Sequence, residues 1–232
     1  MIEKPIISSA DAAKLISSGQ KVMVGGFMGC GSPPELLKSL AESDTDGLTL
    51  ICNDCGLYDS VKNIATGVAK NVKKKQFSKV ITSHIGLNPE IQRQLLNGET
   101  EVELVPQGTL AEQIRSAGCG LGGFLTPTGV GTEVEEGKQV IEVDGKKFLL
   151  EYPLKGDIAL IHASRADKAG NLQYARSARN FGPLMAMACS TVIVQADEIV
   201  EIGEIDPENV ITPSIFVNYL VRTENREVKN GI

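Results

Sequence analysis

The stretch "VMVGGFMGCGSPPELL" at residues 22–37 places an apolar run, a glycine-rich loop and a helix start directly after one another. Val22–Val24 predicts a short buried strand, and Leu36, Leu37 and Leu40 recur at the spacing of one buried helix face. A strand that runs through a tight loop into a helix is the repeating unit of α/β folds. The stretch therefore predicts the fold class.

The same alternation continues along the chain. Further strands are predicted at Leu48–Cys52, Val80–Ile85, Val102–Val105, Ile158–Ile161 and Val192–Gln195. Helices are predicted from Ser9 to Gly19, at Val61–Val72, from Asn88, at Leu110–Ser116 and near Pro183–Cys189. This order predicts an α/β fold in three layers, with an open, mostly parallel sheet covered on both faces. We expect residues 1–232 to form a single domain.

One segment breaks this rhythm. Within residues 118–155, Asp144-Gly145 stands between two runs of strand-forming residues, which is typical of a tight β-hairpin. We expect it to be an antiparallel insertion on the main sheet.

Composition narrows the class of partners and the compartment. The formal net charge of −6 and a pI near 5.1 argue against nucleic acid as the main partner. The longest nearly apolar run, Leu184–Val194, is too short to span a bilayer, and no signal peptide is apparent at the N-terminus. Five scattered cysteines do not suggest a disulfide framework. We expect a cytoplasmic protein without a membrane partner.

The glycine loop Gly25–Ser32 lies where an open α/β sheet binds its ligand, at the carboxyl end of a strand. Its backbone N–H groups, and the N-terminus of the helix with Ser32 as N-cap and Pro33 at the first position, predict an anion site. The sequence is not a P-loop, because Ser32 and Pro33 follow the last glycine where that motif has Lys. Packing alone would explain one or two of the four glycines.

A second glycine cluster contains a literal G-x-G-x-x-G at Gly118, Gly120 and Gly123. It follows a predicted helix and does not open one, so it lacks the context of a dinucleotide site. The loop Gly118–Thr132 is expected to be ordered and to approach a ligand or a neighbouring chain closely. The sequence assigns no role to its single residues.

The cysteine and histidine pairs carry weak signals. Cys52 and Cys55 form one CxxC pair without a second pair for zinc, so we expect them to fill space at a strand end. His84 and His162 follow predicted strands, but no G-x-S-x-G elbow accompanies them. We expect structural hydrogen bonds from both histidines, with a minor site role left open.

Gln107 follows the strand "ELVP" at the carboxyl edge of the sheet. Its amide can donate to a developing oxyanion. Capping of nearby backbone groups is an equally supported role. With these donors, but with no convincing nucleophile or base, the sequence describes half of an active site.

These residues resemble the signature of the alpha (A) subunits of family I CoA-transferases, which runs G-G-F, three residues, G, one residue, P. Gly25, Gly26, Phe27, Gly31 and Pro33 match it, and Ser18 replaces the acidic or amide residue upstream. The similarity extends over "VPQGTLAEQIR" (105–115), "TPTGVGT" (126–132), "VEEGKQ" (134–139), "ARNFGPLMAMA" (178–188) and "GEIDPENVITPSIFV" (203–217). The segment "TSHIGLNPE" (82–90) is most similar to the acetate/acetoacetate–butyrate type, and the 3-oxoadipate type ranks second.

The resemblance implies a hetero-oligomer of alpha (A) and beta (B) subunits, of A2B2 composition or larger, that is active only when both kinds of chain are present. It implies ping-pong transfer of CoA from an acyl-CoA to a carboxylic acid through a glutamate of the beta subunit. CoA would be a substrate, with no permanent cofactor and no metal. Gln107 would stabilise the oxyanion. The residues implied in CoA contact are Gly25, Gly26, Phe27, Met28, Gly29, Cys30 and Gly31. A CoA-binding module without catalysis is the alternative of a different class.

Overall fold

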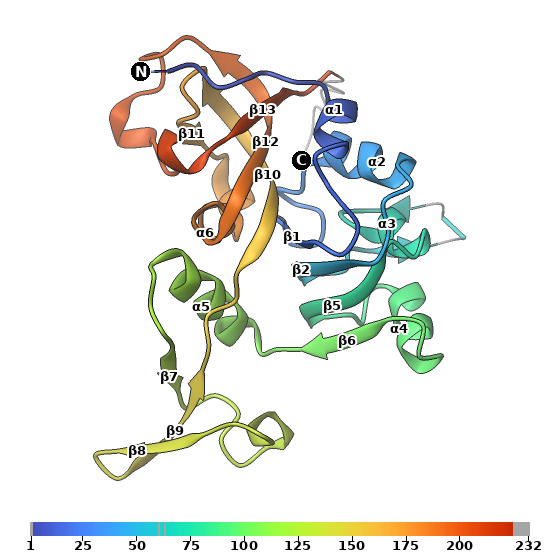
Figure 1. Ribbon diagram of the computed structural model, residues 1–232, viewed down its shortest axis with the longest axis vertical. Coiled ribbons are helices and arrows are strands. Elements are labelled where there is room, and N and C mark those ends of the chain that lie inside the picture. Colours follow the sequence, from blue (N-terminus) through green and yellow to red (C-terminus); the bar gives the residue numbers. More distant parts are fainter. Residues whose placement is uncertain (1, 60, 63, 225–232) are drawn as a thin grey trace.

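The computed structural model describes residues 2–59, 61–62 and 64–224. Its main sheet has the strand order β13-β12-β10-β1-β2-β5-β6, and every pairing along this path is parallel (Figure 1). These strands are β1 (Lys21–Val24), β2 (Leu48–Asp54), β5 (Phe77–His84), β6 (Glu101–Leu104), β10 (Gly156–Asp167), β12 (Cys189–Val200) and β13 (Tyr219–Arg222). A short strand, β11 (Leu172–Gln173), pairs antiparallel with β10. The α/β prediction is confirmed.

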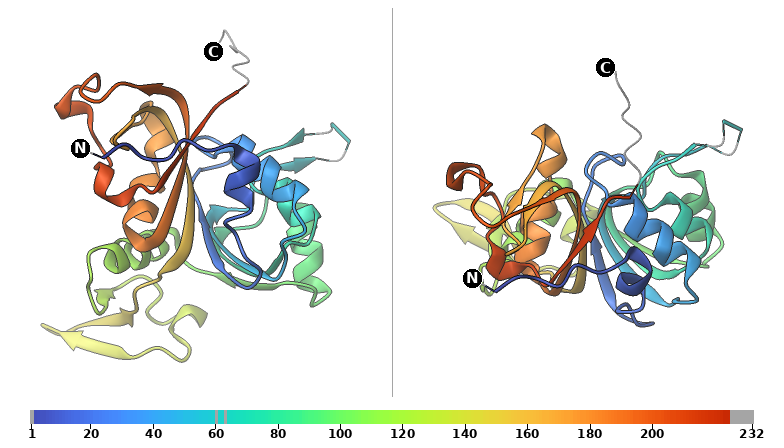
Figure 2. Two further views of the ribbon diagram at one scale, coloured as in Figure 1. Left: turned by 45° about the horizontal axis from the view of Figure 1, so that its top comes forward. Right: turned by 90° about the horizontal axis from the view of Figure 1, so that it is seen from above.

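Helices cover both faces of the sheet, on opposite sides in Figure 2. Because successive side chains of a strand point to opposite faces, Met23 packs into the core with α5 and α6, whereas Val22 and Val24 pack with α1–α4. The helices are α1 (Ser9–Ala13), α2 (Pro34–Glu42), α3 (Ala69–Lys73), α4 (Pro89–Leu96), α5 (Gln107–Gly118) and α6 (Gly182–Ala188). Short 3-10 turns lie at η1 (Glu133–Glu135), η2 (Arg176–Arg179), η3 (Pro207–Asn209) and η4 (Ser214–Phe216).

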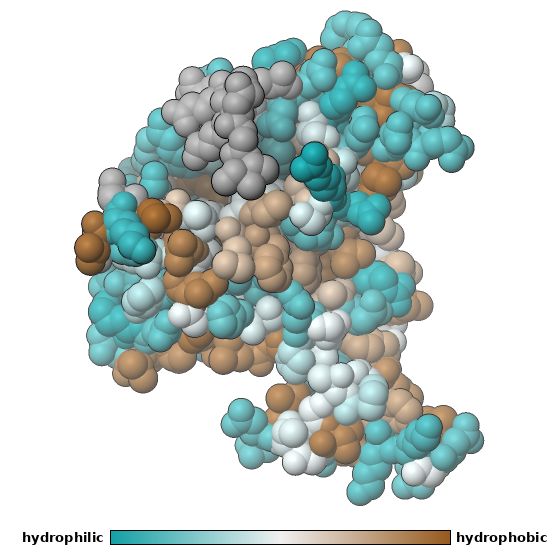
Figure 3. All heavy atoms as spheres, turned by 180° about the vertical axis from the view of Figure 1, so that it is seen from behind, coloured by the Kyte–Doolittle hydropathy of each residue, from teal (hydrophilic) through white to brown (hydrophobic). Residues whose placement is uncertain are grey.

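The antiparallel insertion extends away from the body as an arm, which we define as residues 124–151 (Figures 1 and 3). Its strands are β7 (Phe124–Thr126), β8 (Val140–Val143) and β9 (Lys146–Glu151), paired in the order β7-β9-β8. They form a sheet of their own, so the expected place of the insertion on the main sheet is wrong, whereas its antiparallel hairpin is confirmed. Asp144 and Gly145 form the predicted tight turn, both with positive φ. The buried Glu151 carboxylate accepts hydrogen bonds from Lys138 of the arm and Gln113 of α5. These bonds hold the base of the arm on the body.

The predicted helix Val61–Val72 is wrong. Strand β4 (Ile64–Ala65), which pairs with β3 (Tyr58–Asp59), lies in its first part, and helix α3 begins at Ala69; residue 63 lies outside the described residues. Thr66 accepts a hydrogen bond from the Leu57 N–H through its hydroxyl, and Gly67 has a φ of +51°. Both features interrupt helical geometry.

Other element bounds differ by a few residues. Ser8, rather than Ser9, caps α1, and this helix ends at Ala13. Strand β10 continues well beyond Ile161, so His162 lies within a strand and not at its end. No helix of the described residues is long and apolar enough to cross a membrane.

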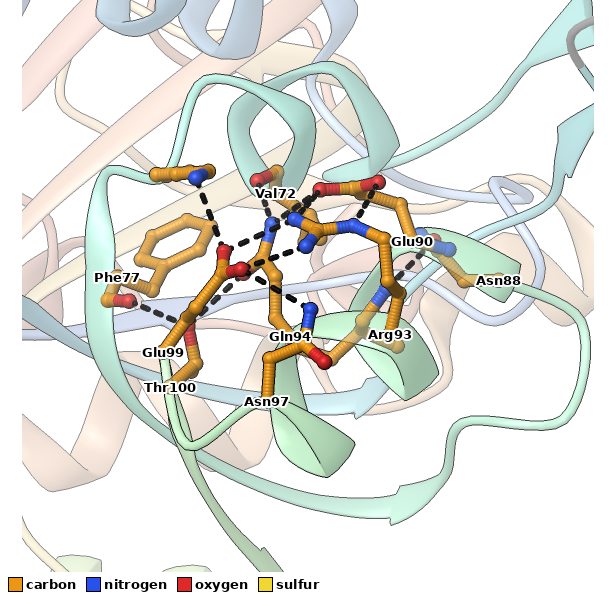
Figure 4. A network of polar contacts seen from close by, with 11 residues as sticks. Val72, Phe77, Asn88, Glu90, Arg93, Gln94, Asn97, Glu99 and Thr100 are labelled. Carbon is orange, nitrogen blue, oxygen red and sulfur yellow. Dashed lines mark hydrogen bonds and ion pairs between the residues drawn. The ribbon is translucent and has the colours of Figure 1, made fainter.

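A charged network links α4 to the turn that follows it and to the turn after α3 (Figure 4). The Arg93 guanidinium donates to both oxygens of Glu99, at 2.6 and 2.9 Å, and to Glu90 at 2.8 and 3.1 Å. Lys75 contacts the same Glu99 carboxylate at 2.9 Å. These cations hold the pKa of Glu99 well below its usual range. The network fixes the start of β6, the strand that leads to Gln107.

Candidate active site

Four neighbouring parallel strands end along one edge of the sheet. Strand β1 ends at Val24, β2 at Asp54, β5 at His84 and β6 at Leu104. In an open α/β sheet, the crevice outside these carboxyl ends is where ligands bind. The glycine loop follows β1 directly, and Gln107 opens the helix after β6. The fold thus brings the sequence-predicted site residues to one edge.

The glycine loop forms a very tight turn. Phe27 and Cys30 exchange two backbone hydrogen bonds of 3.0 and 2.9 Å. The two residues between them, Met28 and Gly29, both have positive φ, as in a two-residue hairpin turn. The turn presents Phe27 and Met28 to the outside, each nearly half exposed. The exposed tip of the loop is therefore apolar.

Close packing within the chain accounts for most of the glycines. A Cβ atom at Gly26 would overlap Ser32, one at Gly29 would overlap Thr66, and one at Gly31 would overlap the Ala178 carbonyl. All three glycines also have positive φ. The expectation that packing explains only one or two of them is wrong, because the loop is wedged between two segments distant in sequence.

Most backbone N–H groups of the loop already have acceptors. Gly25 donates to the Leu160 carbonyl, Gly26 to the Asn180 side chain and Met28 to the Asp54 carboxylate at 2.8 Å. Within the described part of the chain, Gly29 and Gly31 are the loop residues whose N–H groups have no acceptor. Only part of the predicted anion cradle is therefore open.

The N-terminus of α2 has no N–H group free for a ligand, so the expected anion site there, with Ser32 as N-cap, is wrong. Pro33 is the N-cap and Pro34 the first helical residue, so neither offers an N–H group. Glu35 and Leu36 donate to the Oε1 atom of Gln195, at 2.9 and 3.4 Å. Gln195 is fully buried on β12 and takes the role that the sequence predicted for Ser32. The helix terminus offers no free donor to a ligand.

A chain of amide and carboxylate groups links the loop to Gln107. Its Nε2 atom donates to Asn53 Oδ1 at 2.6 Å, and Asn53 Nδ2 donates to Asp54 Oδ2 at 2.8 Å. Asp54 also accepts from the N–H groups of Met28 and Gly56. Asn53 is buried, whereas Gln107 is exposed. An amide nitrogen carries two hydrogens. Asn53 therefore orients the Gln107 amide through one of them, and the second has no acceptor among the described residues.

Three residues of this edge were not predicted from the sequence. Asn53 and Asp54 lie inside the "CNDC" stretch, which was read only for its cysteines. Asn180, in a turn before α6, accepts from Gly26 and donates to the Cys30 carbonyl at 3.0 Å. The available signal was position: polar residues at the end of a buried strand face the ligand edge of the sheet.

The remaining candidates have structural surroundings. Cys52 and Cys55 are buried free thiols, and burial raises the pKa of the Cys52 thiol well above its usual value. His162 Nε2 lies 2.9 Å from Asp197 Oδ1, and His84 is exposed at the end of β5. Gly118 ends α5 where a Cβ would overlap Met187 of α6, so it serves close helix packing. No group of residues that could hold a metal ion occurs among the described residues.

The chain is similar to known proteins over most of its length. The family model "Coenzyme A transferase" matches residues 6–223. The chain is 50% identical to the alpha chain of the acetate CoA-transferase of Escherichia coli over 93% of its own length and 96% of that protein. It is 43% identical to the alpha chain of the acetoacetyl-CoA:acetate/butyrate CoA transferase of Clostridium acetobutylicum, covering 94% of this chain and 97% of that one.

A solved structure shows the same fold. The acyl-CoA transferase of E. coli O157:H7, in a thioester complex with CoA, superposes with a TM-score of 0.84 at 20% identity. The match covers 99% of this chain and 49% of that one, so the chain spans about half the length of that enzyme. On the family match and the identities over nearly full length, this chain belongs to the coenzyme A transferase family, as a subunit of the alpha type.

Proposed function

We propose that this chain, as one domain of residues 1–232, is the alpha subunit of a cytoplasmic short-chain acyl CoA-transferase. With a beta subunit, in an A2B2 or larger assembly, it moves CoA between an acyl-CoA and a free carboxylate of the acetate, acetoacetate or butyrate class. The observation that carries the proposal is that this edge of the sheet has a hydrogen-bond donor for an oxyanion but no carboxylate free to act as a nucleophile among the described residues. An oriented Gln107 amide and an exposed loop tip meet there, while the one carboxylate in the cluster, Asp54, already accepts three hydrogen bonds.

The reaction then needs a carboxylate from the partner. A glutamate oxygen of the beta chain attacks the thioester carbonyl carbon, and the C–S bond breaks to release the CoA thiolate and leave a mixed anhydride. The thiolate attacks the glutamyl carbonyl of that anhydride, which frees the first acid and forms a glutamyl-CoA thioester. The acceptor acid reverses these steps. Dividing one difficult exchange into such covalent steps lowers each barrier.

This chain would contribute binding and electrostatics. Each carbonyl attack places negative charge on an oxygen, and a preorganised donor near that oxygen stabilises the transition state. The free hydrogen of Gln107 Nε2 is our candidate donor, held in place by Asn53. Phe27 and Met28, with the rest of the loop Gly25, Gly26, Gly29, Cys30 and Gly31, would contact the CoA arm.

The test is reconstitution. We expect the purified chain alone to be inactive and to acquire transferase activity when a beta chain is added. Incubation with acyl-CoA followed by borohydride or hydroxylamine should label a glutamate of the partner and leave this chain unlabelled. Robust transfer by this chain alone would contradict the proposal. Tight CoA binding by the isolated chain, with no copurifying partner, would favour a binding module.

Acyl specificity needs a separate measurement. The second-ranked reading is a 3-oxoadipate or succinyl type of CoA-transferase. A panel of acceptor acids decides between the two: higher kcat/KM with acetate and butyrate supports the proposal, and higher kcat/KM with 3-oxoadipate or succinate supports the alternative.

A further inference from the structure

A cavity of about 280 Å³ adjoins the glycine loop. The loop forms one wall, α2 another, and the segment between β4 and α3 the third. We call it the lysine cavity, after Lys38 and Lys70. Other residues that line it are Met28, Gly29, Ser32 and Thr66. None of the mechanism above uses these lysines.

The charge of this cavity is opposite to that of the protein. The chain carries a net charge of −6, yet Lys38 and Lys70 line the cavity, and no aspartate or glutamate of the described residues does. Within the described residues Lys70 forms no ion pair, and Lys38 forms only a long contact of 3.9 Å with the exposed Glu42. Two largely uncompensated cations around one cavity favour an anionic ligand.

Uncharged donors face the same space. Ser32, Gly29 and Gly67 also line the cavity. In the part of the chain that the structure describes, the Ser32 hydroxyl and the N–H groups of Gly29 and Gly67 donate no hydrogen bond. Pro34 and Leu37 add apolar surface. Hydroxyl, backbone N–H and ammonium donors without any facing carboxylate are the combination that binds phosphate oxygens.

A chain of hydrogen bonds links a residue of the cavity to Gln107. Met28 lines the cavity and donates its N–H to Asp54, which accepts from Asn53, and Asn53 in turn accepts from Gln107. A smaller cavity behind the loop is lined by Asp54, Gly29, Ser32 and Gly67 together. The cavity and the chain of groups that ends at Gln107 therefore both adjoin the glycine loop, as a ligand bound along that loop requires.

The size of the cavity indicates how much of such a ligand it holds. Its volume is slightly below the range of about 300–1,000 Å³ that is usual for sites of drug-sized molecules. It suits one end of an elongated molecule, such as a diphosphate with part of a ribose. We propose that the lysine cavity binds the phosphate-bearing nucleotide end of CoA, with Lys38 and Lys70 facing its phosphates. This inference rests on the proposed function for the identity of the ligand, and on the cavity for its chemistry.

The test uses the assembled alpha/beta enzyme and compares acetyl-CoA with acetyl-pantetheine, which lacks the nucleotide. The variants are Lys38→Gln, Lys70→Gln and the double variant. Lys74→Gln is the matched control, because Lys74 is an exposed lysine at the other end of α3 with no contact to the cavity. We expect the double variant to raise the KM for acetyl-CoA about tenfold, since screened lysine–phosphate contacts act on binding, with kcat changed less than about twofold. The KM for acetyl-pantetheine should stay the same in every variant.

A binding measurement keeps the cavity separate from catalysis. Adenosine 3′,5′-bisphosphate, titrated calorimetrically into the same complexes, should bind the double variant about tenfold more weakly than the wild type or the control. Weaker bisphosphate binding with an unchanged KM for acetyl-CoA would show a site for a separate phosphorylated ligand and overturn the assignment to CoA. Unchanged bisphosphate binding and KM would overturn the site itself.

Two further outcomes are distinguishable. Arg176 and Arg179 lie on the opposite flank of the loop, in the turn whose Ala178 carbonyl packs on Gly31. A rise in KM confined to Arg176→Gln or Arg179→Gln would assign the phosphates to that flank and overturn this proposal. If the wild-type complex transfers no CoA at all, the proposed function fails, while the bisphosphate titration still decides whether the lysine cavity is an anion site.

Discussion

Two polar networks of this protein, the one around Arg93 and the one around Gln107, are built from the same kinds of groups and differ in how completely they are satisfied. Around Arg93, the guanidinium donates to Glu90 and Glu99, and the buried side chains of Gln94 and Thr100 beside it also form hydrogen bonds within the chain (Figure 4). Around Gln107, the buried Asn53 is paired on both sides, whereas the exposed Gln107 amide nitrogen has one acceptor among the described residues. A network that is satisfied inward stabilises the fold, and one with open donors is prepared for a ligand.

We expect the largest effect, on kcat, from a change in the network around Gln107. In the assembled enzyme, Gln107→Ala should lower kcat by about ten- to a thousandfold, the range for losing one oxyanion donor. Steady-state kinetics checks this, with gel filtration to confirm that the alpha/beta assembly is intact. Gln139→Ala, an exposed glutamine on the arm, is the control and should behave as the wild type. An unchanged kcat in Gln107→Ala would remove Gln107 from the site and make both networks structural.

The next largest effect, on stability, is expected from the close packing of the glycine loop against Thr66 and Ala178. Gly31→Ala forces a side chain into a left-handed backbone and against the Ala178 carbonyl, so we expect a loss of at least about 2 kcal/mol in the free energy of unfolding. Gly25→Ala is the matched control, because its Cβ would make only an ordinary contact of 3.5 Å with Ile161. It should change stability by less than about 1 kcal/mol. Urea unfolding of the two variants measures the difference, and equal losses would contradict this role of the packing.

We expect the smallest effect, on Tm, from a change in the network around Arg93. Glu99→Gln should lower the Tm less than Gly31→Ala does, because exposed ion pairs contribute little. The folded state holds the pKa of Glu99 below its unfolded value, so its stabilising contribution is present above that unfolded value, about 4.3. It is lost as the pH falls further, toward the folded pKa. Thermal unfolding from pH 7 to pH 3 should show the difference in Tm between wild type and Glu99→Gln shrinking in the acid range, with kcat at pH 7 unchanged. A difference in Tm that grows on acidification would contradict this sign.

Much of the fold was predictable because its signals are local. Strand and helix periodicities along residues 22–37 and beyond predict α/β alternation, and Asp144-Gly145 predicts the hairpin of the arm. The helix predicted at Val61–Val72 failed for a nonlocal reason. The Thr66 hydroxyl binds the Leu57 N–H, and Gly67 turns the chain so that the segment can pack against Gly29. Apolar spacing alone carries no information about such contacts.

The candidate site divides in the same way. Gln107 and the glycine loop were found from the sequence because each follows a recognisable strand, and the motif around the loop resembles that of a known family. Asn53, Asp54 and Asn180 were missed, since their importance depends on which loops lie beside them. The residue that caps α2, Gln195, comes from a strand on the far side of β1.

The amino-acid sequence by itself determined the layered α/β fold, the position of the glycine loop at a strand end and the family that the loop motif resembles. All three depend on the spacing of residues close together in the chain. Only the tertiary structure decided which donors remain free. The glycines of the loop pack against Ser32, Thr66 and Ala178. Side chains of Asp54, Asn180 and Gln195 accept hydrogen bonds from backbone N–H groups that the sequence predicted to face a ligand. Hydrogen-bonding capacity is a property of a residue, whereas its satisfaction is a property of the neighbours that the fold supplies.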